Sequence, residues 1–415
     1  MPAAQARLTF ATVTTSAEAQ TNSQLAARLA DPAFWATDPH PHLARLRSQA
    51  PLALCEEPDV PRFWAVSKHA DLLRISRDPA TFCSSKGVLL MDLVRDLPHI
   101  PGALLYIDPP DHVRYRRLLN PAFSTSKMRA LEANTRTRVR ALIDALPSGE
   151  PVDIVAKLTV PFPLLVIADL LGVPGEDWPR FYKWSDIMIG AATEITDESI
   201  TMLGEMANYF LEMVAQRRID PRDDLVTMLC HADVDGHTLT DEELMMFYGQ
   251  LLVAGNETTR NLLSGGLIAL AEHPDQWQLL RDDPARIPIA VEELLRWTTP
   301  VISFMRTATC DVTVSDTQIS EGDPLLLLYT SANRDEDAFG PTAIQLDVTR
   351  ETNNQVAFGF GEHFCLGAAL ARIEARVFFE EVTTRFSTIA LAGEPQRLAS
   401  GVIAGITSAP LLFTS

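Results

Sequence analysis

One cysteine near the C-terminus lies among residue types that could hold a reactive sulfur. Cys365 stands in the segment FGFGEHFCLG, residues 358–367, between glycines and aromatic side chains. After it, the apolar residues Leu370, Ile373 and Val377 recur at helical spacing, which places the sulfur at the start of a helix. The free N–H groups and the dipole at that helix end favour an anion, so we expect the thiol to ionise readily and to donate electron density to a ligand.

A lone cysteine is more often a small buried apolar side chain, and residue type alone favours that interpretation. The surrounding pattern reverses the preference. Phe358, Gly361, Cys365 and Gly367 complete the spacing Phe-x-x-Gly-x-x-x-Cys-x-Gly, which resembles the haem-ligand loop of the cytochrome P450 family. The two glycines would permit a tight turn before the sulfur and the close approach of a large flat ligand after it.

A long helical pattern spans residues 240–273, and polar residues interrupt it at its centre. It opens with the capping box TDEE, and Gly255 is followed by Glu257 and Thr258 in its middle. The glycine weakens the helix, and a threonine hydroxyl can bind a backbone carbonyl, so we expect a kink that makes a groove for dioxygen. The alternative is a buried helix in which the glycine serves packing and the polar patch is incidental. Burying an acid and an alcohol there is costly, which favours a functional pair.

The resemblance to cytochrome P450s gives this helix a role. It implies that haem b binds between the long helix and the cysteine loop, with Cys365 as the iron ligand and dioxygen on the opposite side. Glu257 and Thr258 match the acid and alcohol that deliver protons in this family, although many bacterial members carry Asp where Glu257 stands. The same resemblance implies that Ala254 contacts the haem and that Val253 contacts the substrate.

Two further groups of polar residues acquire a function only through this resemblance. His112 and Arg116 lie four apart on one helical face, and by themselves they would be an ordinary solvated pair. The resemblance implies that these two bind the haem propionates, together with Arg306 and His363. It also implies a buried structural ion-pair cluster that braces the loop before the haem ligand. Its members would be Glu293, Arg296 and Arg350.

Apolar residues in several segments are the candidates for contact with a lipophilic substrate. The segment from residue 84 to residue 105 is unusually apolar for a loop, so it either covers a ligand or simply packs on the core. Residues 401–405 predict a hairpin tip, which the family places in the pocket. With these segments, the implied substrate-binding residues are Val88, Leu90, Val253, Val301, Phe304 and Ile403.

Composition bounds the architecture that positions these residues. The 415 residues contain no linker or internal repeat, so we expect a flexible tail at residues 1–22 and one domain at residues 23–415. The resemblance implies a mainly α fold with small β-sheets. The net charge of −19 argues against nucleic-acid binding, and neither a signal peptide nor a bilayer-spanning stretch is recognisable. Five scattered cysteines indicate a reducing compartment, so we expect a cytoplasmic protein. We also expect a monomer without a membrane anchor.

The function implied is that of a haem-thiolate monooxygenase of the soluble bacterial type, which hydroxylates a C–H bond of a terpenoid, steroid or fatty acid with O2. Two electrons would come from an iron-sulfur ferredoxin and its NAD(P)H-dependent reductase. Residues 111–140 are rich in arginine on an otherwise acidic chain, and we expect the ferredoxin to dock near Arg114, Arg117 and Arg129. The alternatives are a peroxide-driven member, which typically has Arg-Pro in place of the acid and alcohol, and a haem-thiolate sensor without catalysis.

Overall fold

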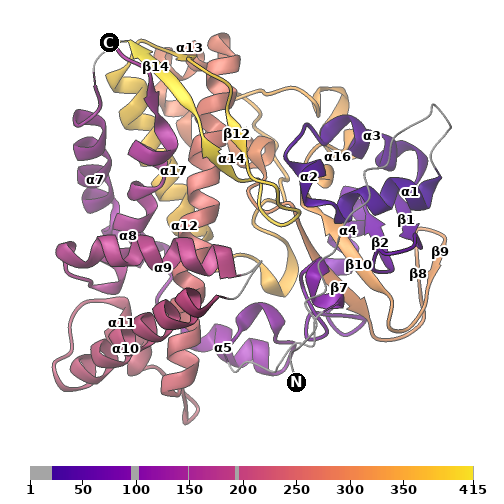
Figure 1. Cartoon of the computed structure of the whole chain (residues 1–415), viewed down its shortest axis with the longest axis horizontal. Helices are drawn as coiled ribbons and strands as arrows, with labels where there is room; N and C mark the ends of the chain where they lie inside the picture. Colours follow the sequence, from indigo (N-terminus) through magenta and orange to yellow (C-terminus); the bar gives the residue numbers. More distant parts are fainter. Residues whose placement is uncertain (1–20, 95–101, 148, 192–195, 415) are drawn as a thin grey trace.

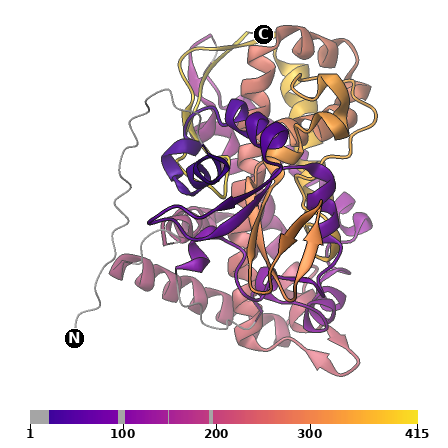
Figure 2. The same ribbon diagram turned by 90° about the vertical axis from the view of Figure 1, so that its right-hand side faces the viewer.

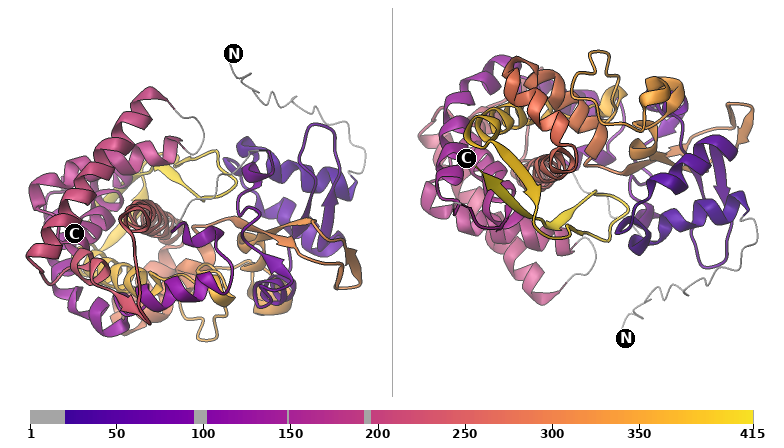
Figure 3. Two further views of the ribbon diagram at one scale, coloured as in Figure 1. Left: turned by 90° about the horizontal axis from the view of Figure 1, so that it is seen from below. Right: turned by 90° about the horizontal axis from the view of Figure 1, so that it is seen from above.

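A single long helix is the axis of the molecule. The structure is a computed structural model, and it describes residues 21–94, 102–147, 149–191 and 196–414. Helix α12 (Asp241–Glu272) crosses the centre in Figure 1 and is seen end-on near the middle of both views in Figure 3. Thr240 accepts a hydrogen bond from the N–H of Glu243, whose side chain accepts in return from the N–H of Thr240. The predicted long helix with its capping box is therefore confirmed.

Helices form most of the body on one side of α12. Four of the helices drawn there in Figure 1 are α7 (Glu132–Asp144), α8 (Pro161–Leu171), α9 (Trp178–Ala191) and α17 (Ala368–Arg385). The other α-helices are α1 (Asn22–Ala27), α2 (Pro32–Trp35), α3 (His40–Gln49), α4 (His69–Ser76), α5 (Asp111–Leu119), α6 (Thr125–Ala130), α10 (Asp197–Ile219), α11 (Leu225–Cys230), α13 (Pro274–Asp282), α14 (Ile287–Thr298), α15 (Tyr329–Ala332) and α16 (Glu336–Phe339).

A mixed five-stranded sheet lies on the other side of α12 and faces the viewer in Figure 2. Its order is β1 (Leu52–Cys55), β2 (Phe63–Val66), β10 (Pro324–Leu328), β7 (Ser303–Ala308) and β3 (Phe82–Cys83). Strands β2 and β10 run parallel, and the other neighbours are antiparallel. The smaller sheets use β4 (Val152–Asp153), β5 (Asp233–Val234), β6 (His237–Thr238), β8 (Val312–Val314), β9 (Thr317–Ile319), β11 (Thr388–Leu391), β12 (Gln396–Arg397), β13 (Ile406–Ser408) and β14 (Pro410–Thr414).

The main apolar core surrounds α12, where small residues let neighbouring helices approach. A Cβ at Gly266 would lie 2.7 Å from the Phe379 ring of α17, and one at Gly255 would lie 2.7 Å from Cδ1 of Ile167 in α8. Glycine at these two positions therefore allows close helix packing that alanine would push apart. The fold is mainly α with small β-sheets, as the sequence predicts.

The N-terminal tail was predicted at residues 1–22, and residues 1–20 lie outside the described part of the chain. Thr21 caps helix α1, which begins at Asn22, so the last two residues of the predicted tail belong to a capped helix. Within the described ranges, no helix has the combination of length and apolar character that crossing a bilayer requires.

Candidate active site

The cysteine loop is fixed by its own backbone and by a glycine packed against α4. The N–H of Cys365 donates to the carbonyl of Phe358 at 3.0 Å, which closes the loop on itself. Gly361 has a φ of +75°, and a Cβ there would overlap the carbonyl oxygen of Ser76 at the end of α4. Helix α17 begins at Ala368 with Gly367 as its N-cap, so Cys365 lies just before the helix start, close to its predicted position.

Burial dominates the electrostatics of this sulfur. The pKa of the Cys365 thiol is raised by desolvation, against the opposing effects of the Gly367 N–H group and the Arg116 and Arg372 charges. The N–H group at the helix start acts in the expected direction, but loss of water has the larger effect on the pKa of the thiol. A metal cation bound to the sulfur would supply the remaining compensation, since a coordinating thiol is deprotonated by its metal.

Hydrogen-bond donors lie beside the loop at the four residues predicted to bind propionates, of which His112 and Arg306 are buried. The rings of His112 and His363 lie 4.2 Å apart, and Ser84 Oγ is 3.1 Å from His363 Nε2. Arg116 donates to the carbonyl of Phe364 at 2.9 Å. Arg306 is buried on β7 and donates to the carbonyl of Met305 at 2.6 Å.

His112 in this cluster is buried without a hydrogen-bond partner among the described residues, and so is Oε1 of the neighbouring Glu362. His112 is 1% exposed, yet neither of its ring nitrogens has a hydrogen-bond partner within the described ranges. Burial, with His363 and Arg116 nearby, lowers the pKa of His112 to about 4. Glu362 Oε1 lies 3.4 Å from His363 Nε2. A donor set of two imidazoles and two guanidinium groups suits the paired carboxylates of a haem, so the residues present fit this cofactor.

The centre of α12 presents the acid and the alcohol on different sides of the helix. Ala254 and Thr258, four residues apart, share an exposed edge of a largely buried helix, and Thr258 Oγ1 donates to the Ala254 carbonyl at 2.6 Å. Glu257 is 3% exposed, and its Oε1 lies 2.9 Å from Nη2 of Arg260. The segment stays α-helical, and Gly255 packs against Ile167. The Ala254 carbonyl is therefore bound by Thr258, as the functional interpretation expects. Gly255 serves helix packing, as the alternative interpretation expects.

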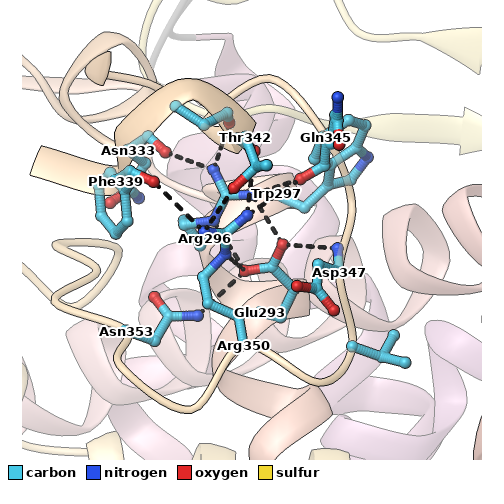
Figure 4. Close-up of polar contacts among 12 residues, drawn as sticks. Glu293, Arg296, Trp297, Asn333, Phe339, Thr342, Gln345, Asp347, Arg350 and Asn353 are labelled. Atoms are coloured by element: carbon cyan, nitrogen blue, oxygen red, sulfur yellow. Dashed lines mark hydrogen bonds and ion pairs between the residues drawn. The ribbon is translucent and has the colours of Figure 1, made fainter. Parts of the chain in front are cut away.

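The predicted structural cluster is a buried hydrogen-bond network, drawn in Figure 4. Arg296 donates to both carboxylate oxygens of Glu293 at 2.7 Å, and both side chains are fully buried. Arg350 donates to Glu293 Oε2 at 3.1 Å. Arg296 also binds three backbone carbonyls in the segments that lead to the cysteine loop. They belong to Asn333, Ala343 and Gln345.

The predicted substrate residues come from three parts of the structure. Val301 forms a β-bridge with Ile403 at the tip of the β12–β13 hairpin, and Phe304 lies on the neighbouring strand β7. Val88 and Leu90 come from the apolar segment that begins at residue 84, of which residues 95–101 lie outside the described part. Val88 is 1% exposed, and Leu90 packs against an apolar core cluster of the N-terminal region. Val253 is partly exposed on α12, one residue before Ala254.

Three residues beside the candidate site were missing from the sequence analysis. Arg260 pairs with the candidate acid, and its i, i+3 spacing from Glu257 was a usable signal. Ser84 approaches His363 from a distant part of the chain, which no local pattern reveals. Arg372 lies 4.6 Å above the Phe358 ring and donates to Glu292 at 2.6 and 3.0 Å.

A hollow of about 780 Å³ opens at the cysteine, beside Arg116 of the donor cluster. Cys365 and Phe364 line it, with Arg116, Arg129, Arg372 and Arg376 among the surrounding side chains. Arg114 and Arg117 were expected to share a docking surface with Arg129, but neither lines this hollow. Arg114 lies 3.7 Å from Asp111, and Arg117 pairs at 2.9 Å with Asp235 of the β5–β6 hairpin. The arginines around this hollow therefore come from three helices, α5, α6 and α17.

A cysteine loop, a cluster of carboxylate-binding donors and a central helix with an exposed alcohol together define a haem-thiolate protein. The sequence model of the family described as Cytochrome P450 matches residues 164–409. Linalool 8-monooxygenase of Pseudomonas putida is 35% identical over 89% of this chain and 94% of its own length. Vitamin D(3) 25-hydroxylase of Pseudonocardia autotrophica is 37% identical over 86% of this chain and 89% of its own length.

Solved structures agree with these relatives. A crystal structure from Novosphingobium aromaticivorans superposes with a TM-score of 0.85 at 33% identity, covering 94% of this chain and 98% of that one. A Mycobacterium marinum cytochrome P450 in complex with pseudoionone gives a TM-score of 0.83 at 33% identity, covering 93% and 98%. The chain belongs to the cytochrome P450 family. It is a monooxygenase, and its cofactor is haem b.

Proposed function

We propose that this monooxygenase hydroxylates a C–H bond of a lipophilic small molecule of the terpenoid, steroid or fatty-acid class, with electrons from a ferredoxin. The observation that carries the proposal is the arrangement of Cys365, the propionate-type donors and the α12 alcohol around one site. The substrate class is supported by the apolar candidates Val253, Val301, Phe304 and Ile403. It is also supported by relatives whose names state that they oxidise linalool, vitamin D(3) and methyl-branched lipid.

The residues of the chain bind, orient and protonate, and the haem when bound supplies the oxidation chemistry. Cys365 would be the iron ligand, and His112, Arg116, Arg306 and His363 would hold the propionates by charge-assisted hydrogen bonds. This assignment is supported by the partnerless nitrogens of His112, which is 1% exposed.

Proton delivery is assigned to Thr258 and Glu257. The Thr258 hydroxyl proton is engaged at the Ala254 carbonyl, so the lone pairs of Oγ1 remain able to accept a hydrogen bond on the exposed edge of α12. Glu257 faces the interior and is held by Arg260, so its carboxylate must exchange that ion pair for water or turn toward Thr258 before it can pass on a proton. We infer that the ion pair with Arg260 controls when the Glu257 carboxyl can transfer a proton.

We place the ferredoxin over the hollow above Cys365. Arg129 supplies positive charge there, whereas Arg372 is paired with Glu292 and Arg376 with Glu132 and Glu380. Phe364 is 39% exposed at the surface of the hollow. An acidic partner would be steered to this surface over short range, so Arg129→Glu should slow electron transfer at low salt and matter less at high salt. Arg180→Glu, on α9 and outside the hollow, is the matched control. Equal rates for the two variants would rule out this docking site.

The remaining expectations concern the state of the protein in the cell. All five cysteines are free thiols in the structure, which supports a reducing location such as the cytoplasm. We propose that the enzyme works there as a monomer that meets its ferredoxin transiently.

Spectroscopy and product analysis test the proposal together. The purified holoenzyme should show the red-shifted Soret band of a ferrous-carbonyl thiolate complex, and that band should be lost in Cys365→Ser. Titration with terpenoids, steroids and branched fatty acids should identify ligands that shift the iron from low to high spin. Reconstitution with ferredoxin and reductase should then give a hydroxylated product. A thiolate spectrum without product from any spin-shifting ligand would favour a sensor instead.

A further inference from the structure

A second, smaller cavity lies away from the cysteine, where the N-terminal helices meet α12, α14 and the β12–β13 hairpin tip. Its volume is about 110 Å³. A cavity of roughly 150 Å³ holds benzene, so this space suits a group of only a few heavy atoms. The hairpin tip, drawn in yellow in Figure 1, lies against α2, because a Cβ on Gly401 would be 3.1 Å from the indole nitrogen of Trp35.

Unsatisfied nitrogen atoms line this small cavity. Arg334 is 7% exposed and Asn261 is 1% exposed, yet Nε of the arginine and Nδ2 of the asparagine have no hydrogen-bond partner within the described ranges. Nδ1 of His40 is also buried without a hydrogen-bond partner within the described ranges. It can donate a hydrogen bond in the tautomer that carries the proton on Nδ1. Buried polar groups are normally paired, so three such nitrogens around one space indicate a missing acceptor.

Most of the charge around the cavity is positive. Arg334 and the exposed Arg397 both line it, and neither guanidinium lies in an ion pair with a described carboxylate. Asp38 and Glu293 act on Arg334 from beyond ion-pair distance and oppose the effect of burial on its pKa. The pKa of His40 is lowered well below its usual value by burial and by three nearby arginines, Arg334, Arg397 and Arg47. Burial also lowers the pKa of Arg334 to about 9, as expected for a cation without a full counter-charge.

Two local features oppose an anion, and both are partial. Nη2 of Arg334 donates to the carbonyl of Trp297 at 3.2 Å, and its guanidinium stacks on that indole with 3.7 Å between the guanidinium carbon and the ring centre. These contacts engage one nitrogen and one face of the guanidinium, but leave Nε unused. Glu272 also lines the cavity, but its side chain is exposed, so water screens its charge.

We propose that this cavity binds a small oxyanion with phosphate or carboxylate chemistry. The oxygens would accept from Nε of Arg334, Nδ2 of Asn261, Nδ1 of His40 and the guanidinium of Arg397. These residues belong to the segment after α15, to α12, to α3 and to β12. The ligand would therefore fasten the N-terminal region and the hairpin to the central helix.

Anion titrations of the haem-bound full-length enzyme test the proposal. The probes are inorganic phosphate and acetate, each compared with chloride at the same ionic strength. Calorimetry should show saturable binding of phosphate or acetate with a one-to-one stoichiometry, accompanied by a rise in melting temperature that chloride does not give. The probe that binds identifies the head group. If neither exceeds chloride, the cavity holds only water and the proposal is overturned.

Variants locate the binding. Arg397→Gln alters an exposed residue and His40→Phe a partly buried one, so both proteins should fold, and each should weaken the anion at least tenfold. Arg286→Gln is the matched control, because Arg286 is an exposed arginine paired with Asp283 outside the cavity. Binding that survives in both cavity variants, or that falls equally in the control, would place the anion elsewhere and refute this site.

Discussion

Replacing Arg296 by methionine should destabilise the protein more than any surface change, because this side chain is the centre of the network in Figure 4. It makes two hydrogen bonds of 2.7 Å to Glu293 and three of 2.7 to 2.9 Å to backbone carbonyls, all with no solvent exposure of its side chain. Breaking a buried ion pair costs about 3–5 kcal/mol, and each orphaned carbonyl adds about 1 kcal/mol or more before relaxation.

The remaining partners of Glu293 limit this loss. Its carboxylate would keep Arg350 at 3.1 Å, the Asn353 amide at 3.0 Å and the Asp347 N–H at 2.9 Å. We therefore expect a decrease of about 5 kcal/mol in the free energy of unfolding, a large part of the roughly 5–15 kcal/mol that a folded domain has. Arg350→Met should cost less, about 1–3 kcal/mol, because Glu293 then keeps its bidentate bonds to Arg296.

Urea unfolding of the haem-bound enzyme measures both losses, with the ferrous-carbonyl absorbance reporting how much protein retains the thiolate ligand. The exposed pair of Arg385 with Asp144, 3.7 Å apart, supplies the control Arg385→Gln, for which we expect a change below about 1 kcal/mol. If Arg296→Met does not fold, the order of Arg350→Met and the control still tests the reasoning. A loss at Arg296 no larger than that of the control, or smaller than that at Arg350, would contradict it.

Three further predictions concern single charges. Glu374 is 1% exposed, and burial raises its pKa well above 4.5. The folded state then keeps a proton that the unfolded state loses above about pH 4.5, so stability should fall by up to about 1.4 kcal/mol per pH unit through this group. Glu374→Gln should leave unfolding unchanged at pH 4 and raise the urea midpoint increasingly from pH 5 to pH 7; a constant difference across that range would exclude burial of the acid as the cause. Arg372→Met removes a positive charge and should lower the reduction potential of the haem iron, whereas Glu292→Gln removes a negative charge and should raise it. Redox titration should show a shift on the order of tens of millivolts for each variant. Shifts of the same sign would refute the role of this pair. Arg260→Met removes the arginine from Glu257, so the carboxyl no longer has to exchange this ion pair before it transfers a proton, and the hydroxylated product formed per NAD(P)H should rise; an unchanged ratio would mean that the ion pair does not control the acid.

The long helix shows how far local sequence determines the fold. A capping box at Thr240, helical spacing of apolar residues and a proline at residue 274 fixed both ends of α12 to within one residue. Those signals lie within the segment itself, so they can be recognised without knowing which residues pack against the helix. The cysteine loop was equally readable, because its glycines and aromatics occur in one short segment with fixed spacing.

Electrostatic behaviour could not be predicted in the same way. Helix position suggested that Cys365 would ionise readily, but the structure shows that burial raises its pKa. The surroundings of the expected docking arginines could not be predicted for a similar reason. Arg117 pairs with Asp235, which lies more than a hundred residues later in the chain. Arg372 lines the hollow, but it lies outside the arginine-rich segment from residue 111 to residue 140.

The sequence by itself located the cysteine loop and the long helix, because spacing and residue chemistry are properties of the chain. Its resemblance to cytochrome P450s predicted which residues bind haem, carry protons and brace the cysteine loop. Only the tertiary structure decided which charges are buried, which are paired, and which donors remain without an acceptor. Arg260 beside Glu257 and Arg334 beside the small cavity are both examples. The physical reason is that desolvation and Coulomb energies depend on distances between segments remote in sequence, and no local pattern encodes those distances.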